Sequence, residues 1–258
     1  MKLISLNTWG GKIYQPLIDF IKQHSTDTDI FCFQEIFSTT SNITEQSGFR
    51  LNLNQEITAV LKNHQGYFAS CVNNYIVGSF QTHFVDFSLS SGLAIFINKK
   101  FPVRSYSDLF VYGKKDSFNP KDLNSLPRNI QYINFLLGNK EFTICNIHGI
   151  WVKGGKGDTP SRIQQSKQIR KLLETRDGGK ILCGDFNLGL DTESIKILDS
   201  SMINLIKKYN IETTRSKFYP RSDKFADYTF ISPDVKVTNF QVPDIEVSDH
   251  LPMILEFS

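Results

Sequence analysis

The polar residues best suited to do chemistry in this chain stand at the ends of apolar runs. Four short clusters have this placement: Leu6-Asn7-Thr8-Trp9, Phe33-Gln34-Glu35, Gly184-Asp185-Phe186-Asn187 and Ser248-Asp249-His250. Each apolar run is typical of a buried strand, so each cluster falls where that strand should end. Carboxylates and amides are costly to bury alone, and several of them at strand ends indicate a shared metal or phosphate site.

The types of these residues narrow the chemistry. Hard oxygen ligands come from five residues, namely Asn7, Glu35, Asp185, Asn187 and Asp249. Two histidines, His148 and His250, occupy similar strand-end positions. Oxygen ligands without cysteine favour Mg²⁺, Mn²⁺ or Ca²⁺ over zinc, and a histidine beside a carboxylate can act as a base or as a cation facing a phosphate. Hydrolysis of a phosphate ester is the simplest reaction that uses all these groups.

The elements that must position these residues are mostly strands. We expect strands at 2–7, 29–34, 67–72, 83–87, 92–98, 130–137, 141–147, 180–184, 227–232, 235–242 and 252–257. We expect helices at 15–24, 55–62, 160–174 and 192–207. The order is not a regular alternation of strand and helix, so we predict an α/β fold, a four-layer α/β/β/α sandwich of two mixed β-sheets flanked by helices.

Composition sets further limits. The chain has 258 residues, enough to bury a sizeable core, and no repeat or linker divides it, so we expect one catalytic domain over 1–258. The formal net charge is only +3, so global charge does not indicate a nucleic-acid partner. The four cysteines have neither zinc-finger nor redox spacing, and we expect buried, reduced thiols.

The sequence also bears on location and assembly. The first residues, MKLISLNTWGG, carry one lysine and too short an apolar stretch for a signal peptide, and no apolar run approaches transmembrane length. We therefore expect a cytoplasmic protein that does not bind a membrane, although removal of a leader would leave the same pattern. Nothing in the sequence opposes a monomer.

Three stretches are typical of loops: 110–129, 151–161 and 213–226. The second contains three glycines and two lysines. The third interleaves basic residues, among them Arg215 and Lys217, with aromatic residues, among them Tyr219. Such a mixture can hold phosphates and stack on bases, but a solvated surface loop would have the same composition.

The ordered motifs resemble the endonuclease/exonuclease/phosphatase superfamily, which includes DNase I-like and apurinic endonuclease-like enzymes. The resemblance is carried by Asn7, Gln34-Glu35, the GDFN stretch ending at Asn187, and Ser248-Asp249-His250. The strand end Asn146-Ile147-His148 and the late strand that begins at Asp227 are similar to further motifs of the family. A single GDxN motif is weak evidence for this family, but six such segments in the same order along nearly the whole chain are specific evidence.

The resemblance implies a role for each matched residue. Glu35 would be the principal ligand of Mg²⁺ or Mn²⁺, assisted by Asn7 and Asp249. Asp185 would orient or deprotonate the attacking water, and Asn187 would hold that water or the phosphate. The remaining matches are His250, His148 and Asp227. His250 would contact the scissile phosphate, with Asp227 as its carboxylate partner, and His148 would steady the non-bridging oxygens.

Structural roles compete with these assignments. Asn7 could cap a turn, Glu35 could lie on the surface, and Asp185 with Asn187 could form an Asx turn. Asp227 could form an ion pair, and His148 could be a hydrogen-bonded core histidine.

Two arginines resemble recurrent positions of the family. Arg128 precedes the strand that leads to Asn146-Ile147-His148. Arg162 opens the helix after the loop at 151–161, here called the Gly/Lys loop. Either could reach the substrate phosphate or tie the structure together.

Our leading hypothesis is a metal-dependent phosphodiester hydrolase of the nuclease or DNA-repair type, with in-line attack by water and a nucleic acid as substrate. The first alternative is a phosphatase or phosphodiesterase of a small phosphorylated molecule, such as an inositol phosphate or a phospholipid head group. The second is a metal- or nucleic-acid-binding module without catalysis. The sequence does not identify the substrate, because one fold of this type serves many.

Overall fold

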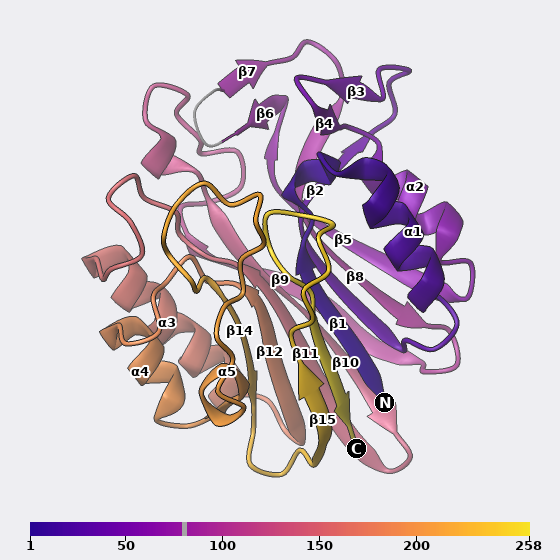
Figure 1. The fold of residues 1–258 in the computed structure, drawn as a ribbon, viewed down its shortest axis with the longest axis vertical. Coiled ribbons are helices and arrows are strands. Elements are labelled where there is room, and N and C mark those ends of the chain that lie inside the picture. Colours follow the sequence, from indigo (N-terminus) through magenta and orange to yellow (C-terminus); the bar gives the residue numbers. More distant parts are fainter. Residues whose placement is uncertain (79–81) are drawn as a thin grey trace.

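Two six-stranded sheets pack face to face in the computed structural model of this chain, which describes residues 1–78 and 82–258 (Figure 1). The first sheet has the order β15 (Val237–Gln241), β16 (Met253–Phe257), β1 (Lys2–Asn7), β2 (Ile30–Thr39), β8 (Leu89–Asn98), β5 (His64–Asn73). The second has the order β13 (Ile203–Asn204), β14 (Asp227–Ile231), β12 (Gly179–Asp185), β11 (Lys140–His148), β10 (Arg128–Leu137), β9 (Val103–Tyr112). Both sheets are mixed, because β1–β2 and β11–β12 are parallel pairs among antiparallel neighbours.

Helices cover the outer faces of the two sheets. The helices α1 (Tyr14–His24) and α2 (Leu53–Val60) lie over the first sheet, and α3 (Pro160–Glu174), α4 (Glu193–Asp199) and α5 (Leu205–Lys208) lie over the second (Figure 1). Two short hairpins extend from one end: β3 (Glu45–Gln46) with β4 (Phe49–Arg50), and β6 (Tyr75–Val77) with β7 (Thr82–Phe84). The predicted four-layer sandwich is confirmed.

Side-chain alternation explains how the layers hold together. On β1, Leu3 packs between the sheets, whereas Ile4 packs under the helices α1 and α2. On β2, Cys32 faces the space between the sheets and Phe33 faces the helices. Strands that are buried on both faces need apolar side chains on both, which is why such runs in the sequence do not alternate with polar residues.

A polar link between the sheets lies close to the strand ends that carry the functional clusters. Gln34 Nε2 donates to Asn146 Oδ1 at 2.6 Å, and Asn146 Nδ2 donates to the backbone oxygens of Phe33 and Ala94 at 3.0 and 3.2 Å. Both side chains are fully buried. A buried, hydrogen-bonded amide pair fixes the register of one sheet against the other, because a slip would leave polar groups unsatisfied.

The structure corrects several sequence-based expectations about elements. The helix predicted at 192–207 is two helices, α4 and α5, separated by β13. Asn204 accounts for the break, because its side chain accepts hydrogen bonds from the backbone of Ile206 and Lys207 and starts α5 anew. The edge strand β9 was not predicted, and its last residues fall in the stretch 110–129 that was expected to be a loop.

Two compositional expectations can also be compared with the structure. All four cysteines are free and buried, as predicted. Within residues 1–78 and 82–258, no helix combines the length and apolar character needed to cross a membrane.

Candidate active site

The strand register of the second sheet brings three predicted residues together. His148 at the end of β11 is paired with Asp185 at the end of β12, and Asp185 is paired with Asp227 at the start of β14. Asn7 reaches the same place from the end of β1 in the other sheet, where its Nδ2 donates to Asp185 Oδ2 at 3.1 Å. Residues that are far apart in the chain therefore share one site, as the strand-end argument predicted.

Glu35 reaches the site by a different route from the one expected. The sequence placed it at a strand end, but β2 continues to Thr39, and the pairing of β2 with β8 shifts register between Phe33 and Ile36. Glu35 has φ of 57°, and this bulge turns its carboxylate toward Asn7, whose Nδ2 donates to Glu35 Oε1 at 3.2 Å. Such bulges re-aim single side chains next to active sites.

Asp185 lies at the centre of the site and is buried. Its Oδ1 accepts the backbone N–H of Asn187 at 2.8 Å, and its Oδ2 lies 3.6 Å from Nε2 of both His148 and His250. Burial alone would raise the pKa of Asp185, but His250 and nearby cations, led by Lys156, hold it well below its usual range. Asp185 is therefore a carboxylate at neutral pH.

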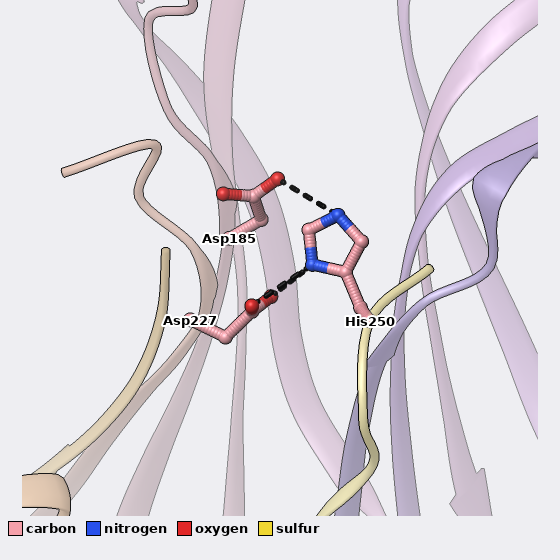
Figure 2. Close-up of side chains that lie close together, drawn as sticks. All are labelled: Asp185, Asp227 and His250. Atoms are coloured by element: carbon pink, nitrogen blue, oxygen red, sulfur yellow. Dashed lines mark hydrogen bonds and ion pairs between the residues drawn. The ribbon is translucent and has the colours of Figure 1, made fainter. Parts of the chain in front are cut away.

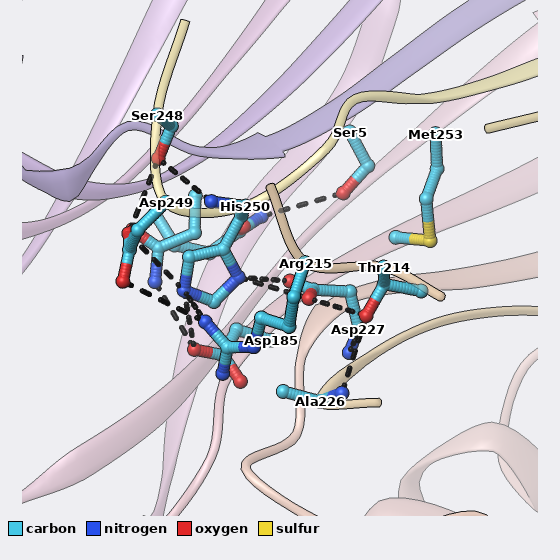
Figure 3. Close-up of polar contacts among 12 residues, drawn as sticks. Ser5, Asp185, Thr214, Arg215, Ala226, Asp227, Ser248, Asp249, His250 and Met253 are labelled. Atoms are coloured by element: carbon cyan, nitrogen blue, oxygen red, sulfur yellow. Dashed lines mark hydrogen bonds and ion pairs between the residues drawn. The ribbon is translucent and has the colours of Figure 1, made fainter. Parts of the chain in front are cut away.

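His250 is held from both sides of its ring. Both carboxylate oxygens of Asp227 lie within 2.9 Å of Nδ1 (Figure 2). Thr214 Oγ1 donates to Asp227 at 3.0 Å. On the opposite side, Arg215 Nη1 lies 2.5 Å from Nε2 (Figure 3). Burial and Arg215 lower the pKa of His250, but the carboxylates Asp227, Asp249 and Asp185 outweigh them and raise it.

His148 lies on the other side of Asp185 and differs in charge. Arg128 Nη1 lies 3.2 Å from His148 Nδ1, and His148 Nε2 lies 3.7 Å from Glu35 Oε1. Burial, and then the charge of Arg128, lower the pKa of His148 well below its usual value. His148 is thus a neutral imidazole that Arg128 orients.

Two groups of residues could hold a cation. Asp185, Asp227 and His250 each offer an atom, and these atoms lie within 4.8 Å of one another. Asp227, however, is already committed to the imidazole and to Thr214. Burial and the neighbouring charge of Asp249 raise the pKa of Glu35, so a divalent cation beside these two carboxylates would offset their repulsion. Glu35 and Asp249, with Asn7 beside Glu35, are thus the second group that could hold a cation.

A cavity of about 400 Å³ opens over these residues. It contacts Glu35, His148, Asp185 and His250, together with both tryptophans and the hydrophobic side chains of Phe37, Phe49, Leu123 and Leu126. This volume suits a ligand of small-molecule size.

The residues predicted to bind substrate do not all meet this cavity. Arg128, Arg215 and Tyr219 line it, and the Arg215 guanidinium lies over the Tyr219 ring at 4.1 Å. Lys217 is exposed and forms an ion pair with Glu246. Arg162 is buried and donates to the backbone oxygens of Ile150, Gly155 and Gly157, so the structure places it as the support of a loop.

The site includes one residue that sequence reasoning missed. Lys156 is buried, lines the cavity, and donates from Nζ to Asn187 Oδ1 at 2.5 Å. The sequence drew attention to the Gly/Lys loop at 151–161 but gave no reason to separate Lys156 from the exposed Lys153. In the sequence, the glycines on both sides of Lys156 and the arginine at position 162 were the features that could have indicated a buried lysine in this loop.

Comparisons with known proteins bear on the family and the fold of this chain. The model of the Endonuclease/Exonuclease/phosphatase family matches residues 4–250. A mannosyl-6-phosphatase of Bacteroides thetaiotaomicron has a TM-score of 0.73 at 19% identity, covering 100% of this chain and 99% of its own. The catalytic domain of human Nocturnin with bound sulfate has a TM-score of 0.65 at 16% identity, covering 100% and 93%.

A humanized TDP2 of D. rerio has a TM-score of 0.66 at 12% identity, covering 100% of this chain and 98% of its own. At these identities the structures share the fold. No curated protein matches the chain.

Proposed function

Because this chain belongs to the endonuclease/exonuclease/phosphatase family of phosphate ester hydrolases, we propose that it hydrolyses a phosphate ester with the help of a divalent cation. One observation carries this proposal. Strand ends, one bulge and the segment before β16 bring Glu35, Asp185, His148 and His250 to the lining of one cavity. Carboxylates, a neutral imidazole and a hydrogen-bonded histidine are the groups that such a reaction requires.

The cation would be Mg²⁺ or Mn²⁺, held by Glu35 and Asp249 with the amide of Asn7 beside them. When bound, such an ion polarises a phosphoryl oxygen and offsets the charge that develops during the reaction. Asn7 now directs its Nδ2 toward Glu35 and Asp185, while its Oδ1 accepts the N–H of Trp9 at 3.0 Å. The amide must therefore rotate if its oxygen is to become a ligand.

Asp185 would hold the attacking water. Asn7 and the backbone N–H of Asn187 fix its carboxylate, and its low pKa keeps it ionised. A carboxylate with so low a pKa accepts a proton weakly, so orientation of the water contributes more than proton abstraction. The water oxygen bonds to phosphorus and the bond to the ester oxygen breaks, so that in net one proton of the water passes to the leaving oxygen.

His250 and His148 would contact the phosphate from two sides. Asp227 fixes the ring of His250 through Nδ1, so that Nε2 points into the site, where Arg215 now lies. A phosphate there would exchange with or share the guanidinium, which favours Arg215 as a phosphate ligand. His148 stays neutral and can donate from one nitrogen while Arg128 holds the other.

We favour a compact phosphate ester as the substrate. The cavity has the size of a small-molecule site, and the basic loop at 213–226 offers fewer free cations than its sequence indicated. Arg215 is buried against His250, and Lys217 is paired with Glu246. A nucleic acid is the second candidate, supported by Trp9 and Trp151, which line the cavity and could stack on bases.

A substrate panel tests the proposal. Single-stranded DNA, duplex DNA, abasic duplex, RNA, inositol phosphates and sugar phosphates would be offered side by side, with Mg²⁺, with Mn²⁺ and with EDTA. We expect metal-dependent release of phosphate from the small esters, strongly reduced in Glu35→Gln. Cleavage restricted to a nucleic acid would establish the nuclease alternative, and no hydrolysis of any member would refute the proposal.

A further inference from the structure

Lys156 is the buried cation of the cavity that the proposed reaction has not yet used. It stands in the loop between β11 and α3, only 9% exposed, with its ammonium 2.5 Å from Asn187 Oδ1. The hydrogen-bond partner is a neutral amide, and the charge of the ammonium is offset through space mainly by the carboxylate of Asp185. A desolvated cation at the wall of a reaction cavity is available to an anionic ligand.

The surrounding loop is built to hold Lys156 in place. Arg162 Nη1 donates to the backbone oxygens of Gly155 at 2.9 Å and Gly157 at 2.5 Å, on both sides of the lysine. The backbone oxygen of Lys156 accepts the N–H of Gly189 at 2.8 Å. The loop is therefore fixed from α3 on one side and from the segment after Asn187 on the other, and the ammonium needs little reordering to bind a ligand.

Asn187 is turned toward the protein. Its Nδ2 donates to the backbone oxygen of Gly149 at 3.2 Å, and its Oδ1 accepts from Lys156. An ammonium has three N–H groups, and Asn187 accepts one of them. Beside Asp185, Lys156 is therefore better placed than Asn187 to donate to a phosphate.

The charge around the cavity indicates what kind of phosphate fits. Five cationic side chains line it, namely Lys12, Arg128, Lys156, Arg215 and Arg221. Three carboxylates line it, namely Glu35, Asp185 and Asp249. A bound divalent cation would add to this positive excess. Phosphate monoesters lose their second proton near pH 6 and are dianions at neutral pH, whereas diesters carry a single charge. A buried ammonium attracts the dianion more strongly.

On the premise that the chain hydrolyses phosphate esters, we propose that Lys156 donates hydrogen bonds to a non-bridging oxygen of the substrate and selects phosphate monoesters over diesters. Asn187 and the loop held by Arg162 are positioning residues for that ammonium. Burial lowers the pKa of Lys156 to about 8, so the group is still mostly charged at neutral pH.

Two chromogenic esters test this inference. The kcat/KM values for p-nitrophenyl phosphate and bis-p-nitrophenyl phosphate would be measured with Mg²⁺ for the wild-type chain, Lys156→Met and Asn187→Gly. Glycine suits position 187, because Asn187 has φ of 57°. We expect Lys156→Met to lower kcat/KM for the monoester about 100-fold and kcat/KM for the diester by no more than about tenfold. Asn187→Gly should also lower the ratio of kcat/KM for the monoester to kcat/KM for the diester.

Lys153→Met is the matched control, since Lys153 is an exposed lysine of the same loop. Its values should stay within about twofold of the wild type. Equal losses on both esters in Lys156→Met, or no loss, would overturn the proposed selection.

Binding of inorganic phosphate separates this inference from the proposed function. Calorimetric titration of the Mg²⁺-loaded wild-type chain with inorganic phosphate should show binding that weakens at least tenfold in Lys156→Met and not in Lys153→Met. If the wild-type chain hydrolyses neither ester, the proposed function fails, but this titration still tests Lys156. Unchanged phosphate affinity in a folded Lys156→Met variant would show that the lysine does not contact the anion.

Discussion

At the scale of single residues, the site is a set of charges that would be unfavourable without one another. Asp185 stays ionised although it is buried, because His250 and Lys156 lie near it. Glu35 shows the opposite balance, since burial, and then the charge of Asp249, raise its pKa. A group that costs folding free energy and lines a cavity indicates function.

The burial of Lys156 gives a stability prediction. Its pKa falls from 10.5 to about 8 mainly through burial. Between pH 8 and pH 10.5 this lysine carries a proton in the unfolded chain but not in the folded chain. Near neutral pH, where both states are protonated, the buried charge therefore lowers the free energy of unfolding by on the order of 3 kcal/mol. We expect Lys156→Met to raise the midpoint of thermal unfolding at pH 7 by several degrees while it lowers activity. A clear decrease in the midpoint would show that Lys156 stabilises the fold instead.

The same residue gives a pH prediction. The ammonium is protonated below its pKa, so binding of a monoester by Lys156 should weaken as pH rises through about 8. In Lys156→Arg the side chain stays charged at all accessible pH, and the alkaline decline of kcat/KM should move upward. A profile of kcat/KM for p-nitrophenyl phosphate from pH 6 to 10 measures this. An identical alkaline limb in the two proteins would assign the decline to another group.

Sequence reasoning identified residues at strand ends and missed the residue in the loop. Asn7, Asp185 and His148 could be brought together because strands end in a common place and the period of two is readable. Lys156 could not be assigned to the site from the sequence, because the direction of its side chain depends on Arg162 and Gly189. These two residues fix the loop only once the chain has folded.

At the scale of elements, local departures from regular structure aim the functional side chains. The bulge in β2 turns Glu35 toward Asn7, and the register of β11, β12 and β14 lines up His148, Asp185 and Asp227. The order of layers and the bounds of α3 were predictable, because α3 has a proline at its start and a clear apolar stripe. The bulge in β2 was not predictable, since one extra residue in this strand leaves the apolar pattern of its sequence intact.

Arg162 should be essential to the Gly/Lys loop. Replacing it with Met removes the donors to the backbone oxygens of Ile150, Gly155 and Gly157, so we expect a loss of about 2 to 4 kcal/mol in the free energy of unfolding. Hydrogen exchange at 151–158 should accelerate in the folded protein. Arg170→Met is the control, because Arg170 is an exposed arginine of the same helix. Unchanged exchange in the loop would contradict a supporting role.

At the scale of the whole molecule, the site depends on both sheets and on both ends of the chain. The residues proposed to hold the metal come from β1, from β2 and from the segment just before β16, while Asp185 comes from the second sheet. The first and last strands are neighbours, and the amino group of Met1 donates to the backbone oxygen of Phe257 at 2.6 Å. A partly folded chain would therefore lack a complete site.

A bound cation should stabilise the folded chain, because the unfolded chain has no assembled site. We expect Mn²⁺ to raise the thermal midpoint of the wild-type protein by several degrees at saturating concentration and EDTA to reverse the change. The double variant Glu35→Gln, Asp249→Asn should show no such increase. An equal increase in that variant would place the cation elsewhere, for example at Asp185, Asp227 and His250.

The most direct measurement is the metal-dependent hydrolysis of a generic phosphate ester by the wild-type chain and by Asp185→Asn. Using p-nitrophenyl phosphate with Mg²⁺ and with EDTA, we expect turnover by the wild type that EDTA abolishes. Asp185→Asn should lose at least about 10³-fold in kcat while it keeps its circular dichroism spectrum and a cooperative unfolding transition. Full activity of Asp185→Asn, or hydrolysis that persists in EDTA, would contradict the site described here.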